Sequence, residues 1–388
     1  MKTVIQNGRI ILKDKILENY NLYFENGKIS AITEEKLGYD EAIDAKGAYV
    51  SPGFIDIHTH GAGGFDFLDG TVEAYVEAAR MHAKFGATSI VPTLTSVDVD
   101  SIQKSIEVLH EAKKANTNGA NLLGFHLEGP YFSQNQKGAQ EERFIHPFCR
   151  EEYESIIKSA KGSILRWSAA PELEGMEDFA DFAVRNGVHL SIGHSDAEFD
   201  CAMNAYEKGF THVTHLYSCT SSIVRINGYR HAGIVEAAYL QDDMTVEIIG
   251  DGAHLPAPLL KLVYKIKGPD KIALITDSMR ATGMPEGKSV LGKLDNGLPV
   301  IVEDGVAKLV DRTAFAGSVA TMDRVVRNMI KLAGVTVCDA VKMASLTPAR
   351  ILNIKNKGEL KAGYDADIII FDENINTMNT IVNGRVIF

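Results

Sequence analysis

Four histidines and two carboxylates in this sequence stand where they could hold a metal ion together. Each of them ends a strand-like run or follows one directly. The six residues are His58, His60, Glu128, His194, His215 and Asp277. Imidazole nitrogens and carboxylate oxygens bind zinc and other divalent metals, and a catalytic site keeps one coordination position open. Each residue alone has an ordinary structural explanation, but the joint pattern predicts a divalent metal centre.

Two parts of this set have a more specific chemistry. His58 and His60 are two residues apart, so on a β-strand both rings project from the same face and supply half of a zinc site. Asp277 follows an apolar strand and could cap the next helix. In a metal site its carboxylate would instead hold the attacking water and take its proton. His254, which ends a further unit, could polarise or orient a substrate.

The elements that position these residues repeat along the middle of the chain. Eight strand-like segments alternate with segments of helical spacing, in which Ala74, Ala78, Met81 and Phe85, for example, share one face. The strands are expected at 54–60, 89–95, 122–128, 165–170, 189–194, 212–217, 245–249 and 272–277. Eight such units predict an α/β fold, a (β/α)8 TIM barrel, whose active sites lie at the C-terminal ends of the strands. A doubly wound open sheet is the alternative, but it usually has fewer strands.

Both ends of the chain differ from this middle part. They consist of short strand-like runs separated by Asn-Gly turns at 7–8, 26–27 and 383–384, and Asn-Gly between apolar runs indicates a hairpin. We expect residues 1–51 and 350–388 to form one small β-sandwich domain built from both termini. Residues 52–349 would form the barrel.

Composition excludes several classes of partner. The 388 residues carry a net charge of −11, from 40 basic and 51 acidic side chains. No block of Lys and Arg could neutralise a run of phosphates, so we expect no nucleic acid partner. The apolar stretches are strand-length, short of the roughly 18 residues that span a bilayer, and the first residues lack an apolar signal region. The scattered cysteines (Cys149, Cys201, Cys219 and Cys338) form no CxxC pair and are typical of reduced thiols in a cytoplasmic protein.

Several motifs carry a family resemblance. Residues 52–61, which include both His58 and His60, resemble the opening motif of the amidohydrolase superfamily. Further segments resemble the N-acetylglucosamine-6-phosphate deacetylases within it, in the same order along the whole chain. They lie at 126–130, 193–195, 214–216, 251–254, 276–279, 316–318 and 361–368.

This resemblance assigns roles to the candidate residues. It implies that Glu128, His194 and His215 hold the principal metal, and that His58 and His60 hold a second ion, with Glu128 able to bridge the two. One or two ions per subunit are expected. Zinc is the first choice, with iron, manganese or cobalt as alternatives. Asp277 would be the acid/base, His254 a substrate ligand, and the protein a homodimer.

The sequence departs from the family pattern around the expected substrate. The family motif at His215 usually continues into Asn-Ala-Met, which helps to bind the sugar phosphate. Here Tyr217, Ser218 and Cys219 follow, and Gln140 stands where the family has a substrate-binding His. Arg230 matches the expected phosphate-binding Arg, and Arg225 is a second candidate.

The predicted activity is metal-dependent hydrolysis of the acetamide of N-acetylglucosamine-6-phosphate, an amino-sugar phosphate. One alternative keeps the chemistry and changes the substrate, to N-acetylgalactosamine-6-phosphate or to an amide without phosphate. Another is a metal-binding protein without catalysis. The presence of Asp277 beside the whole ligand set argues against this last alternative, because binding alone needs no proton shuttle.

Overall fold

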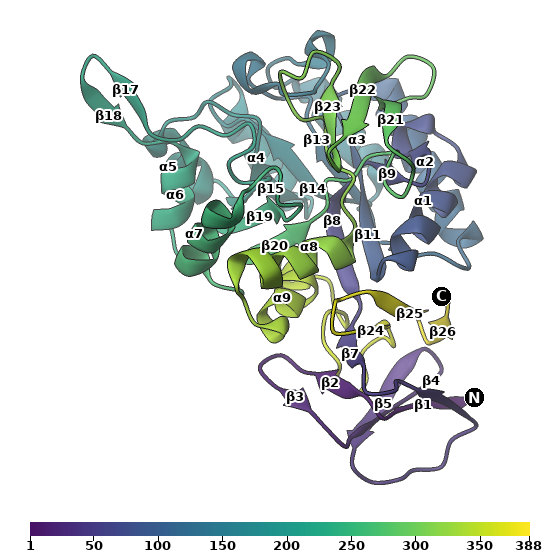
Figure 1. The fold of residues 1–388 in the computed structure, drawn as a ribbon. Helices are drawn as coiled ribbons and strands as arrows, with labels where there is room; N and C mark the ends of the chain where they lie inside the picture. The colour runs from purple at the N-terminus through teal and green to yellow at the C-terminus, as the bar shows by residue number, and fades with distance from the viewer.

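The computed structural model describes residues 1–388, and its centre is a barrel of eight parallel strands (Figure 1). Each strand pairs with the next one along the chain. They are β8 (Phe54–Thr59), β11 (Ala87–Leu94), β13 (Phe125–Glu128), β14 (Ile164–Ala169), β15 (His189–Ile192), β16 (Phe210–Val213), β19 (Thr245–Ile249) and β20 (Ile272–Ile275). The ring closes between β20 and β8, where the N–H of Asp277 donates to the carbonyl of His58 at 2.9 Å. The predicted (β/α)8 barrel is confirmed.

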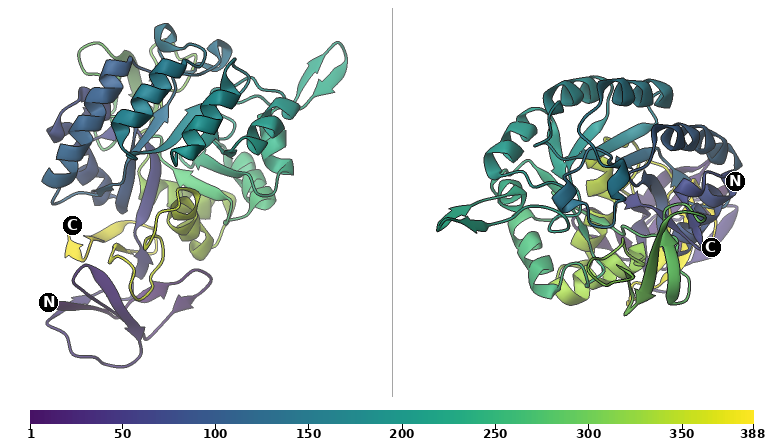
Figure 2. Two further views of the ribbon diagram at one scale, coloured as in Figure 1. Left: turned by 180° about the vertical axis from the view of Figure 1, so that it is seen from behind. Right: turned by 90° about the horizontal axis from the view of Figure 1, so that it is seen from above.

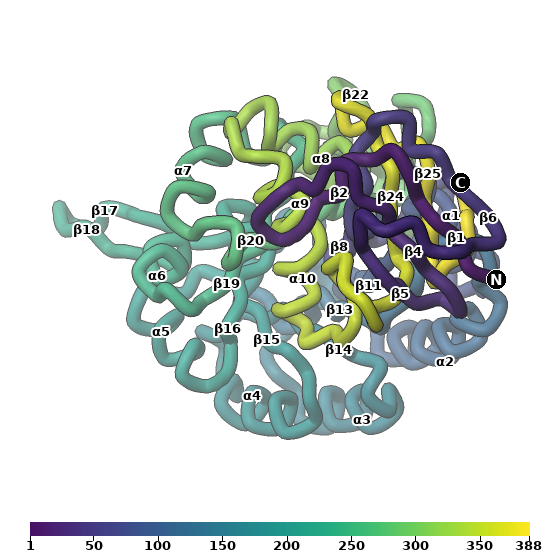
Figure 3. The backbone as a smooth tube through the Cα atoms, turned by 90° about the horizontal axis from the view of Figure 1, so that it is seen from below, coloured from purple at the N-terminus to yellow at the C-terminus, as the bar shows by residue number.

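Helices surround this ring, as the end-on view in Figure 2 shows. They are α1 (Val72–Lys84), α2 (Val99–Ala115), α3 (Arg150–Ala160), α4 (Met176–Arg185), α5 (Phe199–Glu207), α6 (Ile234–Leu240), α7 (Ala257–Lys267), α8 (Met322–Asn328) and α9 (Val337–Ala344). A further helix, α10 (Leu346–Ile351), lies beneath the ring, at the N-terminal ends of the strands (Figure 3). In α1 the hydroxyl of Thr71 caps the N-terminus, and Ala74, Tyr75 and Ala78 are buried on one face. The largest apolar core therefore forms between strands and helices, where removal of apolar surface from water stabilises the fold. No helix has the length and apolar character needed to cross a membrane.

The inside of the barrel is unusually polar. Arg166 and Ser168 on β14, Glu247 on β19 and His126 on β13 are all fully buried. The interior of such barrels is usually filled by branched apolar side chains. Here charged and hydrogen-bonding groups are buried within the ring, beside an apolar cluster of the strands that includes Ile57, Ile249 and Ile275.

Two sheets built from both termini lie at the N-terminal side of the barrel strands, as Figure 3 shows from below. One has the order β5-β4-β1-β6 and the other β26-β25-β24-β7-β2-β3. Their strands are β1 (Lys2–Gln6), β2 (Arg9–Ile11), β3 (Ile16–Leu17), β4 (Asn21–Glu25), β5 (Lys28–Thr33), β6 (Glu41–Asp44), β7 (Tyr49–Pro52), β24 (Ile368–Phe371), β25 (Thr377–Val382) and β26 (Arg385–Val386). Antiparallel pairing of β24 with β7 joins the two ends of the chain. The expected boundary at 349/350 falls inside α10, which packs against β8 and β20 of the barrel. We therefore propose that this domain comprises residues 1–51 and resumes after Ile351.

Two insertions follow the sixth and the eighth barrel strand. The hairpin of β17 (Val224–Ile226) and β18 (Tyr229–His231) projects away from the barrel (Figures 1 and 2). The antiparallel sheet of β21 (Gly287–Leu291), β22 (Leu298–Glu303) and β23 (Val306–Leu309) stands beside the barrel mouth. The second insertion supplies part of the wall of the pocket described next.

Candidate metal centre and substrate pocket

The six predicted metal ligands come together at the C-terminal ends of the barrel strands. Their ligand atoms form two groups, and within each group all the atoms lie within 4.8 Å of one another. The first group is His58, His60 and Asp277, and the second is Glu128, His194 and His215. All six side chains are buried.

Glu128 lies between the two groups. Its Oε1 is 3.0 Å from Nε2 of His215, 3.2 Å from Nε2 of His194 and 3.4 Å from Nε2 of His58. Its other oxygen, Oε2, is 3.4 Å from Nε2 of His60. One carboxylate therefore faces imidazole nitrogens of both groups.

In three of these histidines the Nδ1–H group donates a hydrogen bond to an acceptor of the protein. Nδ1 of His194 donates to the carbonyl of Gln136 at 2.7 Å, and Nδ1 of His215 donates to that of Ser218 at 3.0 Å. Nδ1 of His58 donates to the Glu247 carboxylate at 2.7 Å. The other ring nitrogen of a neutral imidazole then carries a lone pair, and this nitrogen, Nε2, faces Glu128 in all three.

This arrangement fits a divalent metal ion. A lone pair that faces a carboxylate is repelled by it unless a cation or a proton lies between them. Nε2 of His58 is buried and has no hydrogen-bond partner. A set of imidazoles with fixed Nδ1–H groups and converging carboxylates has the donor chemistry of a zinc-type site.

The charges in the site point the same way. Burial disfavours protonation of His58, but the carboxylates of Glu247, Asp277 and Glu128 outweigh burial and raise its pKa to about 10. Burial alone would raise the pKa of Asp277, but His58 and His60 hold it below its usual value. The neighbouring histidines likewise hold the pKa of Glu128 well below its usual value, against the effect of burial. Two ionised carboxylates thus face the imidazoles at neutral pH, and this negative charge attracts a cation.

The backbone turns sharply where the strands deliver these side chains. His194, His215 and Asp277 follow their strands with φ of 48°, 26° and 50°, which is the left-handed region. Such values are uncommon in residues other than glycine and cluster at functional sites. Asp277 is braced there by the N–H of Ser318, which donates to its carbonyl at 2.7 Å.

A cavity of about 290 Å³ opens beside the metal ligands. Its wall includes five of the six candidate ligands, all but His58, and the predicted substrate residues His254, Gln140, Ser218 and Cys219. Nδ1 of His254 donates to the Asp251 carboxylate at 2.8 Å, so its Nε2 remains available to a substrate. Gln140 already uses both ends of its amide, because Oε1 accepts from the N–H of Ser96 at 2.7 Å and Nε2 donates to Glu128 at 2.8 Å.

The structure does not bring Arg225 and Arg230 to this cavity. Both lie exposed on the β17–β18 hairpin, and neither lines the pocket. The guanidinium of Arg230 makes one hydrogen bond, to the carbonyl of Gly228 in its own turn. Arg230, the expected phosphate-binding residue, therefore lies away from the cavity of its own chain, because the insertion that carries it projects outward.

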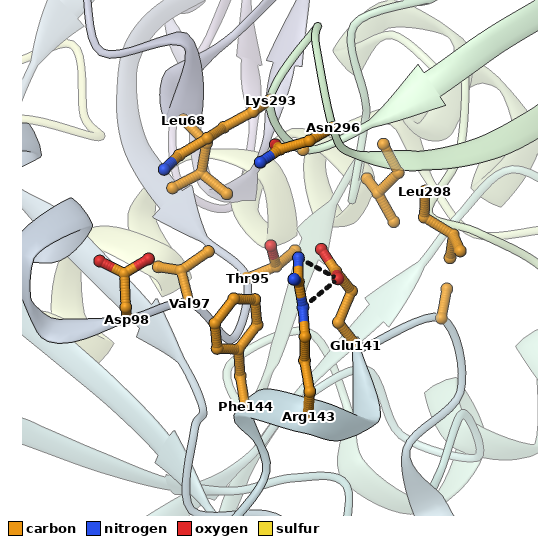
Figure 4. Close-up of a pocket in the computed structure, with 13 residues that line it drawn as sticks. Leu68, Thr95, Val97, Asp98, Glu141, Arg143, Phe144, Lys293, Asn296 and Leu298 are labelled. Atoms are coloured by element: carbon orange, nitrogen blue, oxygen red, sulfur yellow. Dashed lines mark hydrogen bonds and ion pairs between the residues drawn. The ribbon is translucent and has the colours of Figure 1, made fainter.

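A second cavity of about 260 Å³ adjoins the first, and the two share Thr95, Ala139 and Leu291 in their walls. Figure 4 shows Lys293 and Asn296 on one side of it and Phe144 and Arg143 on the other. Arg143 is paired with Glu141. The second cavity therefore shares part of a wall with the first, but none of the six candidate ligands lines it.

Sequence reasoning missed the residues that support the ligands from behind. Glu247 and Arg166 lie in strands that the sequence predicted, and both point into the barrel, where they are fully buried. The available indication was a charged residue between apolar neighbours in the middle of a strand, which Glu247 has in Val246 and Ile248.

Barrel, ligand set and domain order together define a class of protein. The amidohydrolase family model matches residues 49–387. The chain belongs to the amidohydrolase family and is a hydrolase.

Proteins similar to this chain include several amino-sugar phosphate deacetylases. The N-acetylglucosamine-6-phosphate deacetylase of Lysinibacillus sphaericus is 32% identical, over 100% of this chain and 98% of its own length. The N-acetylgalactosamine-6-phosphate deacetylase of Escherichia coli O157:H7 is 29% identical, over 99% of each. The crystal structure of the Pasteurella multocida N-acetylglucosamine-6-phosphate deacetylase has a TM-score of 0.92 at 29% identity, and covers 100% of this chain and 99% of its own. The predicted family is therefore confirmed.

Proposed function

We propose that this enzyme hydrolyses the acetamide of N-acetylglucosamine-6-phosphate to glucosamine-6-phosphate and acetate. The observation that carries the proposal is the position of Asp277, at the edge of a cavity and 3.1 Å from a ligand histidine, His60. A carboxylate in that position is what hydrolysis needs and binding alone does not. The names of the similar proteins support the substrate.

We assign the principal metal ion to Glu128, His194 and His215, and a second ion to His58 and His60, with Glu128 between them. When bound, a divalent cation lowers the pKa of water towards neutrality and polarises a carbonyl. Zinc suits the imidazole and carboxylate donors, and iron, manganese or cobalt are the alternatives.

In this proposal Asp277 moves the proton. Its pKa is held low by the neighbouring histidines, so it is ionised and able to accept a proton from the attacking water. The water oxygen bonds to the acetyl carbon, and the carbon–nitrogen bond breaks. Asp277 returns its proton to the departing nitrogen, which leaves as an amine. One carboxylate thus serves as base and then as acid.

His254 would orient the substrate. The carboxylate of Asp251 fixes the tautomer of the His254 imidazole by accepting from its Nδ1–H. Asp251→Asn is expected to lower kcat/KM by roughly tenfold or more, because a hydrogen bond to a charged group contributes about 1.5–3 kcal/mol and about 1.4 kcal/mol is one decade. Steady-state kinetics checks this, with Asp243→Asn as the control for an exposed ion pair. Equal rates in wild type and Asp251→Asn would contradict the role of His254.

We further propose a homodimer in which the β17–β18 hairpin of one subunit contacts the other subunit. Large apolar side chains are exposed along this segment, including Ile223 at 61% and Tyr229 at 77%. An exposed apolar patch of this kind marks a protein contact. Arg230 on the same hairpin would then reach the partner's pocket and bind the phosphate there.

Arg230→Ala is therefore expected to lower kcat/KM for N-acetylglucosamine-6-phosphate by roughly one to two orders of magnitude. The loss should vanish on N-acetylglucosamine, which has no phosphate. Mixed dimers of Arg230→Ala and Asp277→Asn subunits should regain activity, because one of their two pockets is then complete. Equal losses on both sugars would mean that Arg230 is structural.

The alternative substrates are N-acetylgalactosamine-6-phosphate or an amide without phosphate. Two observations support testing these alternative substrates. The substrate cavity contains no Lys or Arg of its own chain, and the adjoining cavity leaves room for a different substituent. We expect acetate release from the three sugars to rank N-acetylglucosamine-6-phosphate first. A preference for either alternative would replace the proposed substrate and leave the metal chemistry in place.

A further inference from the structure

The carboxylate of Glu247 connects the two groups of metal ligands from behind. It accepts from Nδ1 of His58 at 2.7 Å and from the backbone N–H of His215 at 3.2 Å. His58 belongs to one group and His215 to the other. The guanidinium of Arg166 pairs with both oxygens of Glu247, with Nη2 at 2.7 Å from Oε1 and Nη1 in contact with Oε2.

Stability does not account for this ion pair. Glu247 and Arg166 are both 0% exposed, and burying two charges costs desolvation that their attraction often only offsets. Apolar residues of similar volume would fill the barrel at least as well. What they would lack is an acceptor for the ring of His58.

No other group performs that task. His126 packs edge-on against His58, with ring centroids 4.5 Å apart, but its own nitrogens are engaged with Thr93 and Ser168. Glu247 is the one acceptor within hydrogen-bond distance of His58 Nδ1. With Nδ1 engaged, Nε2 lies 3.4 Å from both Glu128 and Asp277.

We propose that Glu247 and Arg166 are positioning residues of the metal centre. Glu247 keeps the hydrogen of His58 on Nδ1 and directs the lone pair of Nε2 at the metal position, and it also holds the backbone that carries His215. Arg166 contacts both oxygens of Glu247 and holds its carboxylate in place. This inference rests on the proposed metal-dependent function.

The test compares Glu247→Gln with wild type and with Asp367→Asn. The control removes the charge of a buried carboxylate that pairs with Lys357 in the terminal domain. Metal-free proteins are titrated with Zn²⁺, and we expect an apparent affinity about 10–100-fold weaker in Glu247→Gln, as for other partners of ligand histidines. The Nδ1–H proton resonance of His58 in the Zn²⁺-loaded protein, which a carboxylate partner shifts downfield, should move in this variant. Asp367→Asn should change neither quantity.

A double variant separates positioning from folding. Arg166→Met with Glu247→Gln removes both charges, so the barrel should keep its thermal stability while Zn²⁺ affinity stays low. Wild-type affinity in either variant would overturn the inference, and so would an unmoved His58 resonance in Glu247→Gln. Wild-type protein that binds no Zn²⁺ would overturn the proposed function together with it. The positioning role alone would be overturned if the wild-type protein binds Zn²⁺ and releases acetate while Glu247→Gln binds Zn²⁺ with equal affinity.

Discussion

Replacing Asp277 with Asn is expected to reduce turnover by about 10²–10⁴-fold, the usual contribution of a general acid–base group. The amide keeps the shape of the side chain but cannot take a proton from water. Because Glu128, His194 and His215 form a separate ligand group, the variant should keep its principal metal ion. KM should change little, so the loss should appear in kcat.

Steady-state kinetics, with the metal content of each preparation measured, checks this expectation. Asp367→Asn again serves as the control. It alters a buried aspartate of the terminal domain that has no proposed role in catalysis, so kcat should be unchanged. An Asp277→Asn enzyme within a few-fold of wild type would show that another residue is the base.

Removing the carboxylate that both ligand groups share should have a still larger effect. Glu128→Ala removes the two oxygens of Glu128, which face four imidazoles, those of His58, His60, His194 and His215. We expect loss of bound metal and a fall in activity beyond the about 10²–10⁴-fold that acid–base loss alone would cause, because water activation and carbonyl polarisation disappear together.

The fold of this variant should survive, because the barrel core lies between strands and helices and not around Glu128. Elemental analysis measures the bound metal, and circular dichroism measures the fold separately. A Glu128→Ala protein with wild-type metal content would contradict the assignment of the ligand.

The sequence predicted the barrel and the convergence of all six candidate ligands for the same reason. A ligand at a strand end, such as His215, follows an apolar run that is visible in the sequence, and the (β/α)8 pattern brings such ends together. The strands 165–170 and 245–249 were predicted as well. Their charged residues were not assigned a role, because strands buried on both faces show no polar alternation that would tell an inward side chain from an outward one.

Two placements required the three-dimensional structure. Arg230 matches a motif, but it lies on a hairpin inserted after β16. The direction of this hairpin depends on its packing, which the motif does not determine. Gln140 occupies the position of a substrate-binding residue, yet its amide is held between Ser96 and Glu128. A motif identifies the position in the chain, while the partners of a polar side chain depend on residues that are distant in the sequence.

Metal dependence of acetate release tests the central proposal most directly. The protein is purified without added metal, stripped with a chelator, and assayed on N-acetylglucosamine-6-phosphate before and after stepwise addition of Zn²⁺. We expect negligible acetate release from the stripped enzyme and recovery that saturates at one or two ions per subunit. Full activity in the stripped, metal-free enzyme would contradict the metal mechanism.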